Sequence, residues 1–154
     1  MYPWTHFIFG GFFGAIAYYV GLLTPEQTLI VAILAALVDI DHYISYIVSH
    51  NHEFSFKKIW NECVLGHFHG RSFIHGPIGL GWITLVLFGI YWISFTWFLI
   101  FALAYYSHYL LDHLHIHMKK ELNINKFGFH LHLFYLELVI GIVVKGLTIL
   151  LLII

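Results

Sequence analysis

Long apolar stretches occupy most of this chain and leave little polar sequence between them. The stretches at residues 6–23, 28–48 and 131–154 are each close to the roughly 20 residues that cross about 30 Å of hydrocarbon. The stretch at 78–117 is too long for one crossing, and we expect it to divide near residues 94–96. The pattern predicts an all-α integral membrane bundle of about five transmembrane helices, formed as a single domain over residues 1–154.

Composition excludes the main alternatives to a membrane protein. The chain is 60% hydrophobic and 10% charged, whereas a soluble domain is typically about 25% charged. A soluble domain of this size leaves too much of its surface in water to hide so many apolar residues. Disordered chains are poor in aromatic residues, which make up 19% here. A formal net charge of -1 gives no basic patch for nucleic acid, and the single Cys63 forms no internal disulfide.

Basic residues indicate the orientation in the membrane. Six of the seven Lys and Arg residues lie in the polar segments at 49–73 and 118–128. The positive-inside rule predicts that these two segments face the cytoplasm. With five spans, the N-terminus then lies inside and the C-terminus outside the cytoplasmic (inner) membrane, so the lipid bilayer is the first expected partner.

All three aspartates, Asp39, Asp41 and Asp112, lie in or at the end of apolar stretches, close to histidines. A carboxylate at membrane depth costs about 2.5–3.5 kcal/mol on insertion scales, so a partner is expected. His42 follows Asp39 by three residues and His108 precedes Asp112 by four, spacings that share a helix face. Asp41 lies about 200° around a helix from Asp39. Both aspartates therefore reach one centre only near a helix end or with a second ion.

The predicted topology brings these residues to one depth. His6 opens the first span and His75 precedes the third, so both join the aspartates at the cytoplasmic side. We predict a divalent metal site there, with one or two ions, Zn²⁺ as the expected metal and Mn or Fe as alternatives. A metal-free network of Asp–His hydrogen bonds, as in a proton relay, is the other interpretation. The predicted ligands are His6, Asp39, Asp41, His42, His75, His108 and Asp112.

The order of these motifs resembles the YdjM-like family of inner-membrane, metal-dependent hydrolases. The matching elements are Thr5-His6 followed by Gly10-Gly11, then Asp39-Ile40-Asp41-His42, then Arg71 and His75, and finally Ser107-His108 with Asp112. The resemblance implies a small helical membrane protein with a divalent-metal site at these positions. The chain departs from the family at Val38, where Pro is usual, and at His69, which Gly70 separates from Arg71. Participation of His69, His115 and Glu137 in the site stays open.

The types of residue at the predicted site also favour hydrolysis. A divalent ion polarises a carbonyl or phosphoryl oxygen and lowers the pKa of bound water, and Asp41 is a candidate base for that water. Arg71, the only arginine, is either a phosphate-binding catalytic residue or a charge that sets topology. The predicted function is a membrane-embedded metal-dependent hydrolase of an ester or phosphoester in a lipid-like substrate.

Two other classes of membrane protein use residues of the same types. A histidine-box di-iron membrane oxygenase has clusters with paired histidines, and this chain has no His-His pair. A metal or proton transporter would place its ligands near the bilayer midplane, usually in an internally repeated chain. Here the ligands gather toward one side and no repeat is found. Hydrolysis is therefore the favoured prediction.

Overall fold

The computed structural model describes residues 3–49, 55, 57 and 73–121, with the backbone alone for 115–121. In chain order, its helices are α1 (Pro3–Tyr19), α2 (Pro25–Leu37), α3 (Ile40–Ser49), the 3-10 helix η2 (Phe73–His75), α5 (Pro77–Ile93) and α6 (Phe95–Glu121). No strand occurs among these residues, so the predicted all-α class is confirmed for this part of the chain. The predicted last span at 131–154 lies outside the described residues.

Local chemistry explains where the helices begin and end. The Thr24 hydroxyl accepts a hydrogen bond from the backbone N–H of Gln27, the Gln27 side chain accepts one from the Thr24 N–H at 2.8 Å, and Pro25 starts α2. This reciprocal pair satisfies two N–H groups that the first helical turn leaves without partners. Ser94 has extended dihedrals between α5 and α6, so the predicted division near 94–96 is confirmed.

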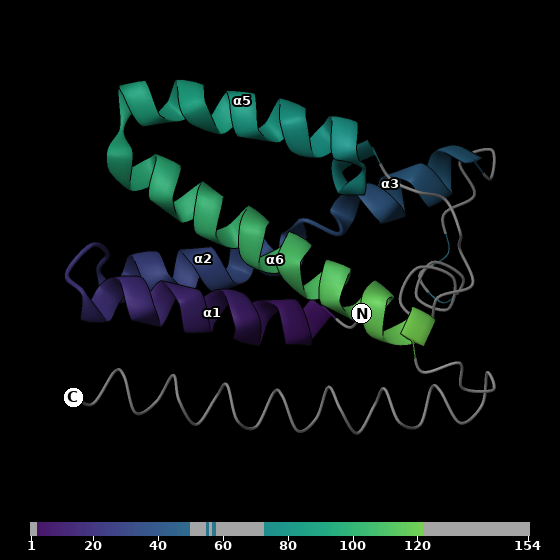
Figure 1. The fold of residues 1–154 in the computed structure, drawn as a ribbon, viewed down its shortest axis with the longest axis horizontal. Coiled ribbons are helices and arrows are strands. Elements are labelled where there is room, and N and C mark those ends of the chain that lie inside the picture. Colours follow the sequence, from purple (N-terminus) through teal and green to yellow (C-terminus); the bar gives the residue numbers. More distant parts are fainter. Residues whose placement is uncertain (1–2, 50–54, 56, 58–72, 122–154) are drawn as a thin grey trace.

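The helices form two hairpins that meet along α6. In Figure 1, α1 pairs with α2 and α5 pairs with α6, while α6 crosses over to contact both α1 and α2. A small core of aliphatic side chains, including Ala17, Val31, Ala35, Ile100 and Ala104, fills the space between α1, α2 and α6. The two hairpin turns lie at the same end of the bundle. The start of α1, the end of α2, the start of α5 and the second half of α6 therefore meet at the other end.

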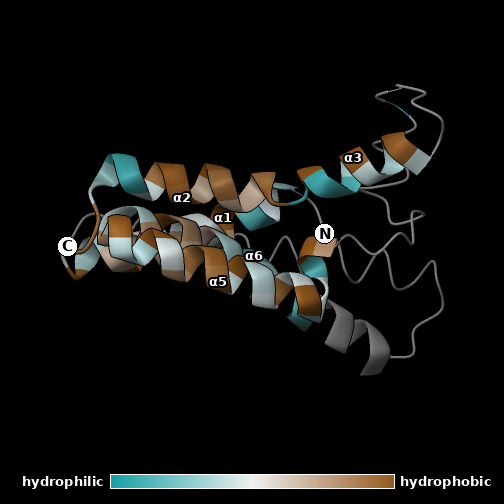
Figure 2. Cartoon of the chain, turned by 90° about the horizontal axis from the view of Figure 1, so that it is seen from above, coloured by the Kyte–Doolittle hydropathy of each residue, from teal (hydrophilic) through white to brown (hydrophobic). Residues whose placement is uncertain are grey.

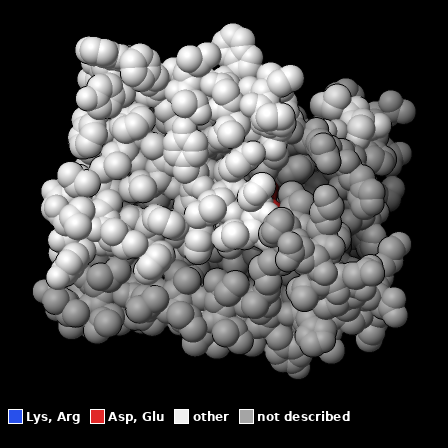
Figure 3. Space-filling model, viewed as in Figure 1, with Lys and Arg blue, Asp and Glu red and all other residues white. Residues whose placement is uncertain are grey.

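The outer surface is strongly apolar. Figure 2 shows α2 as hydrophobic along most of its length, with hydrophilic residues at its first turn and again where α3 begins. Large apolar side chains stand exposed on α5, among them Trp92 and Ile93. On the face drawn in Figure 3, the only charged colour visible on the described residues is a small red patch in a recess. Such a surface suits contact with lipid rather than water.

One helical stretch, Pro25–Ser49, is long and apolar enough to cross a membrane, with a mean hydropathy of 1.7. It comprises α2 and α3, and α5 is a shorter apolar helix. These findings apply to the described residues. The arrangement of five spans stays a prediction.

The stretch at 28–48 differs from the single continuous helix expected there. It breaks at Val38 and Asp39, between α2 and α3. The Val38 N–H still donates to the Leu34 carbonyl at 3.1 Å, and helical bonding resumes where the His42 N–H donates to the Asp39 carbonyl at 3.0 Å. Asp39 therefore occupies a helix end in the middle of an apolar segment.

Two glycines of α1, Gly10 and Gly14, let α1 and α2 approach closely. A Cβ added at Gly10 would lie 2.5 Å from the Ala35 Cβ, and one at Gly14 would lie 3.2 Å from the Thr28 carbonyl oxygen. The Thr28 hydroxyl also donates to the Gly14 carbonyl at 3.1 Å. A side chain at either glycine would therefore push the two helices apart.

Substitution of Gly10 by alanine is expected to destabilise the α1–α2 pair. The added methyl group would overlap Ala35, and overpacking of this kind costs about 1–3 kcal/mol. Gly11→Ala is the matched control, because its Cβ would make only an ordinary 3.4 Å contact with Ala32. Thermal unfolding in detergent, followed by circular dichroism, should give a lower Tm for Gly10→Ala and an unchanged or higher Tm for Gly11→Ala. Equal Tm values for the two variants would contradict the close approach.

Candidate metal centre

Four side chains from three parts of the chain surround one point at the open end of the bundle. The Nε2 of His6, from α1, lies 3.6 Å from Asp39 Oδ2 and 3.4 Å from Asp112 Oδ1. The Nε2 of His108, from α6, lies 3.3 Å from Asp39 Oδ1 and 3.4 Å from Asp112 Oδ2. Their four ligand atoms lie within 4.8 Å of one another. The topology argument had predicted this gathering from the order of the spans.

The spacing of these atoms suits a shared cation better than direct hydrogen bonds. Ligands about 2.1 Å from a tetrahedral ion are roughly 3.4 Å apart, whereas N–H···O bonds are about 2.7–3.2 Å long. The His6 side chain has no exposed surface, and neither ring nitrogen has a hydrogen-bond partner among the described residues. Because buried polar atoms are normally paired, a metal ion bound at His6 Nε2 would explain this arrangement.

Asp39 also belongs to a second group of ligand atoms. The Nε2 of His75 lies 3.5 Å from Asp39 Oδ1, and the Nε2 of His42 lies 3.9 Å from the same oxygen. Asp39, His42 and His75 form a separate set whose ligand atoms also lie within 4.8 Å of one another. The His75 Nε2 is 2.9 Å from the His108 Nε2, so the two groups adjoin.

Neighbouring groups fix the orientation of the imidazoles. The Nδ1–H of His108 donates to the Ala35 carbonyl at 2.8 Å, which directs Nε2 toward the carboxylates. On His75, Nδ1 lies 3.5 Å from Asp41 Oδ2, and Nε2 faces Asp39 and Asp112. The carboxylate of Asp41 is therefore not a member of either ligand group and contacts a member of one.

The carboxylates also influence the charge of His75, which lies in η2 ahead of α5. Burial lowers the pKa of His75, but its interactions with the nearby carboxylates of Asp39, Asp41 and Asp112 outweigh burial and raise the pKa to about 10. A proton on His75 thus balances part of the negative charge at this end of the bundle. A divalent cation among the same ligand atoms would replace that positive charge.

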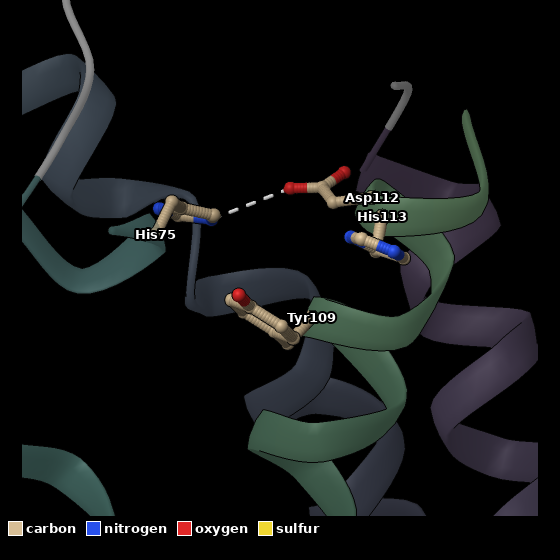
Figure 4. Close-up of a pocket in the computed structure, with 4 residues that line it drawn as sticks. All are labelled: His75, Tyr109, Asp112 and His113. Carbon is tan, nitrogen blue, oxygen red and sulfur yellow. Dashed lines mark ion pairs between the residues drawn. The ribbon is translucent and has the colours of Figure 1, made fainter. Parts of the chain in front are cut away.

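A small pocket of about 100 Å³ opens beside these residues. His75, Tyr109, Asp112 and His113 line it, and Figure 4 shows the ion pair between His75 and Asp112 across its mouth. The Asp112 side chain is 21% exposed, whereas His6 and His108 are fully buried. The ligand atoms are therefore reached through this pocket beside Asp112, or past His42, whose side chain is 28% exposed.

The structure brings all seven predicted ligands to the same end of the bundle. Six belong to the two ligand groups, and Asp41 contacts His75. The break before α3 is the helix end that Asp39 and Asp41 require to face one centre. Arg71, His69 and Glu137 lie outside the described residues, as does the His115 side chain.

Sequence reasoning overlooked three groups around the centre. The hydroxyl of Tyr105 donates to the Ile74 carbonyl at 2.8 Å and holds η2 against α6, Tyr109 lines the pocket, and the Ala35 carbonyl orients His108. The spacing of Tyr105, three residues before His108, could have indicated a shared face. A backbone carbonyl leaves no signal in the sequence.

Comparison with known proteins identifies a matching family. A family model described as YdjM inner membrane protein matches residues 1–116. The matched segment contains all seven predicted ligands. No curated protein and no solved structure matches the chain.

Proposed function

The chain belongs to the YdjM inner membrane protein family, and from this we propose that it is a membrane-embedded, metal-dependent hydrolase. Its substrate is an ester or phosphoester of a lipid-like molecule. The observation that carries the proposal is the arrangement of His6, Asp39, His108 and Asp112, whose nitrogen and oxygen atoms alternate at 3.3–3.6 Å. This composition and spacing suit Zn²⁺, with Mn or Fe as alternatives.

The group that contains His6 has enough ligand atoms to bind one ion, and the other group provides a position for a second ion. Asp39 and Asp112 each turn one carboxylate oxygen toward His6 and the other toward His108 and His75. Asp39 belongs to both ligand groups, so it would help to hold either ion. We assign the first ion to the group that contains His6, and a second to the group of Asp39, His42 and His75.

Each remaining residue has a defined part in the proposed reaction. When bound, a divalent cation supplies Lewis acidity, which polarises an ester oxygen and lowers the pKa of water. Asp41 holds His75 in its orientation and is the carboxylate left to accept a proton from water. The pocket bordered by Tyr109 and Asp112 admits the ester group. For Arg71, which lies outside the described residues, we propose the phosphate-binding role of its two sequence-based alternatives.

The proposal places the centre at the cytoplasmic side of the inner membrane. Four of the five proposed spans start or end at the centre, and the N-terminus is inside, as the distribution of Lys and Arg predicts. A lipid head group at that surface would reach the Asp112 side of the pocket without leaving the bilayer.

Metal-dependent release of phosphate or a head group tests the proposal. Detergent-purified protein is incubated with a panel of phospholipids and with bis-p-nitrophenyl phosphate, before and after removal of metal by a chelator. We expect hydrolysis of at least one lipid, its loss on chelation and its return with added Zn²⁺ or Mn²⁺. Metal uptake into liposomes without hydrolysis would instead indicate a transporter, and oxygen-dependent turnover with bound iron would indicate an oxygenase.

A further inference from the structure

An apolar groove runs beside the metal centre, between α2, α5 and α6. Its volume is about 330 Å³, within the range of about 300–1,000 Å³ that is typical of ligand sites. Ile83, Val86 and Ile90 of α5 form one wall, and the side chains of α2 and α6 form the others. Ile83 and Ile90 are about 10 Å apart along the helix, so this wall extends over about two turns of α5.

The groove adjoins the metal centre through the backbone. Its lining includes Val38 and Ile40, the two neighbours of Asp39, and Ile74, which directly precedes His75. The same short segments therefore shape the end of the groove and present two of the proposed metal ligands.

The groove offers its occupant almost no hydrogen-bonding group. Apart from Tyr105, the residues that line it have aliphatic or aromatic hydrocarbon side chains. The Tyr105 hydroxyl already donates to the Ile74 carbonyl at 2.8 Å. A bound molecule gains from this surface only by burying apolar atoms, which selects a hydrocarbon chain.

We propose that this groove binds one acyl chain of the substrate lipid, with the ester group of that lipid at the metal centre. This assignment rests on the proposed function for the identity of the head-group site. An acyl chain fits because the groove is apolar and its lining includes chain neighbours of both Asp39 and His75. Because the chain leaves lipid or detergent rather than water, it gains from close packing against the groove walls.

Photolabelling tests the assignment without any turnover. The probe is a long-chain phosphatidic acid with a diazirine at the end of one acyl chain, added to chelator-treated protein in detergent. We expect labels on the groove residues of α5 and α6, and competition by unlabelled long-chain but not dihexanoyl phosphatidic acid. Because no metal is needed, labelling at the groove without hydrolysis would refute the proposed function and leave the groove assignment intact.

Val86→Trp is the test variant and Leu85→Trp is its matched control. Both residues are exposed, at 55% and 63%, on adjacent positions of α5, but only Val86 lines the groove. We expect Val86→Trp to reduce labelling at least about fivefold and to raise KM for long-chain lipid. Leu85→Trp should behave as the unsubstituted protein.

Several outcomes would overturn the assignment. Equal labelling of Leu85 and Val86 would mean that the probe samples the lipid-facing surface without preference. No labelling at any chain length would mean that a segment of this chain or a second copy covers the groove. Hydrolysis with the same KM for long and short chains would show that the enzyme acts without the groove.

Discussion

The Asp39→Asn variant is expected to purify without bound divalent metal. Both carboxylate oxygens of Asp39 face histidines, Oδ2 toward His6 and Oδ1 toward His42, His75 and His108. Asparagine keeps the shape of the side chain but removes its charge and replaces one oxygen with an NH₂ group, which cannot bind a cation. Even loss of a partner that only orients a ligand costs about 10–100-fold in metal affinity, so we expect a loss of at least about 100-fold.

Elemental analysis of detergent-purified protein measures this effect. His108→Ala should show the same loss, because its Nε2 faces both Asp39 and Asp112. Glu26→Gln makes the same carboxyl-to-amide change at the exposed first turn of α2 and should keep the metal content of the unsubstituted protein. Circular dichroism establishes that each variant is folded. Full metal content in both Asp39→Asn and His108→Ala would disprove the site.

Sequence predicts the position of the centre because polar residues in apolar segments are costly. Asp39 and Asp112 need partners, and antiparallel spans leave few histidines at the same depth. Local signals were equally informative at Pro25, whose fixed φ starts α2, and at Ser94, between α5 and α6. These features depend on single residues or on the order of the spans.

The break between α2 and α3 could not be located from the sequence, which left a helix end near Asp39 and a second ion as alternatives. Apolar residues continue on both sides of Asp39, and neither glycine nor proline marks the interruption. Tertiary contacts determine the position of the break instead, since Asp39 contacts side chains from α1, η2 and α6. The fixed tautomer of His108 likewise depends on the Ala35 carbonyl, 73 positions earlier in the chain.

The spacing of the glycines near the start of α5 indicates close packing there, but it does not indicate which element packs against α5. Gly76, Gly79 and Gly81 all suggest close approach at the start of α5. In the structure, a Cβ added at Gly79 would overlap the Phe73 carbonyl oxygen and lie 2.9 Å from the Ile74 Cα, whereas one at Gly81 would meet nothing within 4 Å among the described residues. Only Gly79 therefore supports η2, which ends at His75.

Gly79→Ala is expected to weaken metal binding although residue 79 contacts no metal ligand. Because the new methyl group collides with the backbone of η2, either η2 or the first turn of α5 must move, and His75 moves with it. Displacement of a site group by about 1 Å can cost about 100-fold in catalysis, and overpacking costs about 1–3 kcal/mol of stability. We expect about tenfold or greater loss of Zn²⁺ affinity by competition with a fluorescent chelator.

Gly81→Ala separates this effect from a general response of α5 to alanine. The same substitution two residues later adds a methyl group to an exposed position and should raise helix stability by about 1 kcal/mol with Zn²⁺ affinity unchanged. His75→Ala should lose affinity at least as strongly as Gly79→Ala. The double variant should then lose little more than His75→Ala alone, because both changes act on one ligand. Additive losses would show that Gly79 influences the centre by a route other than His75.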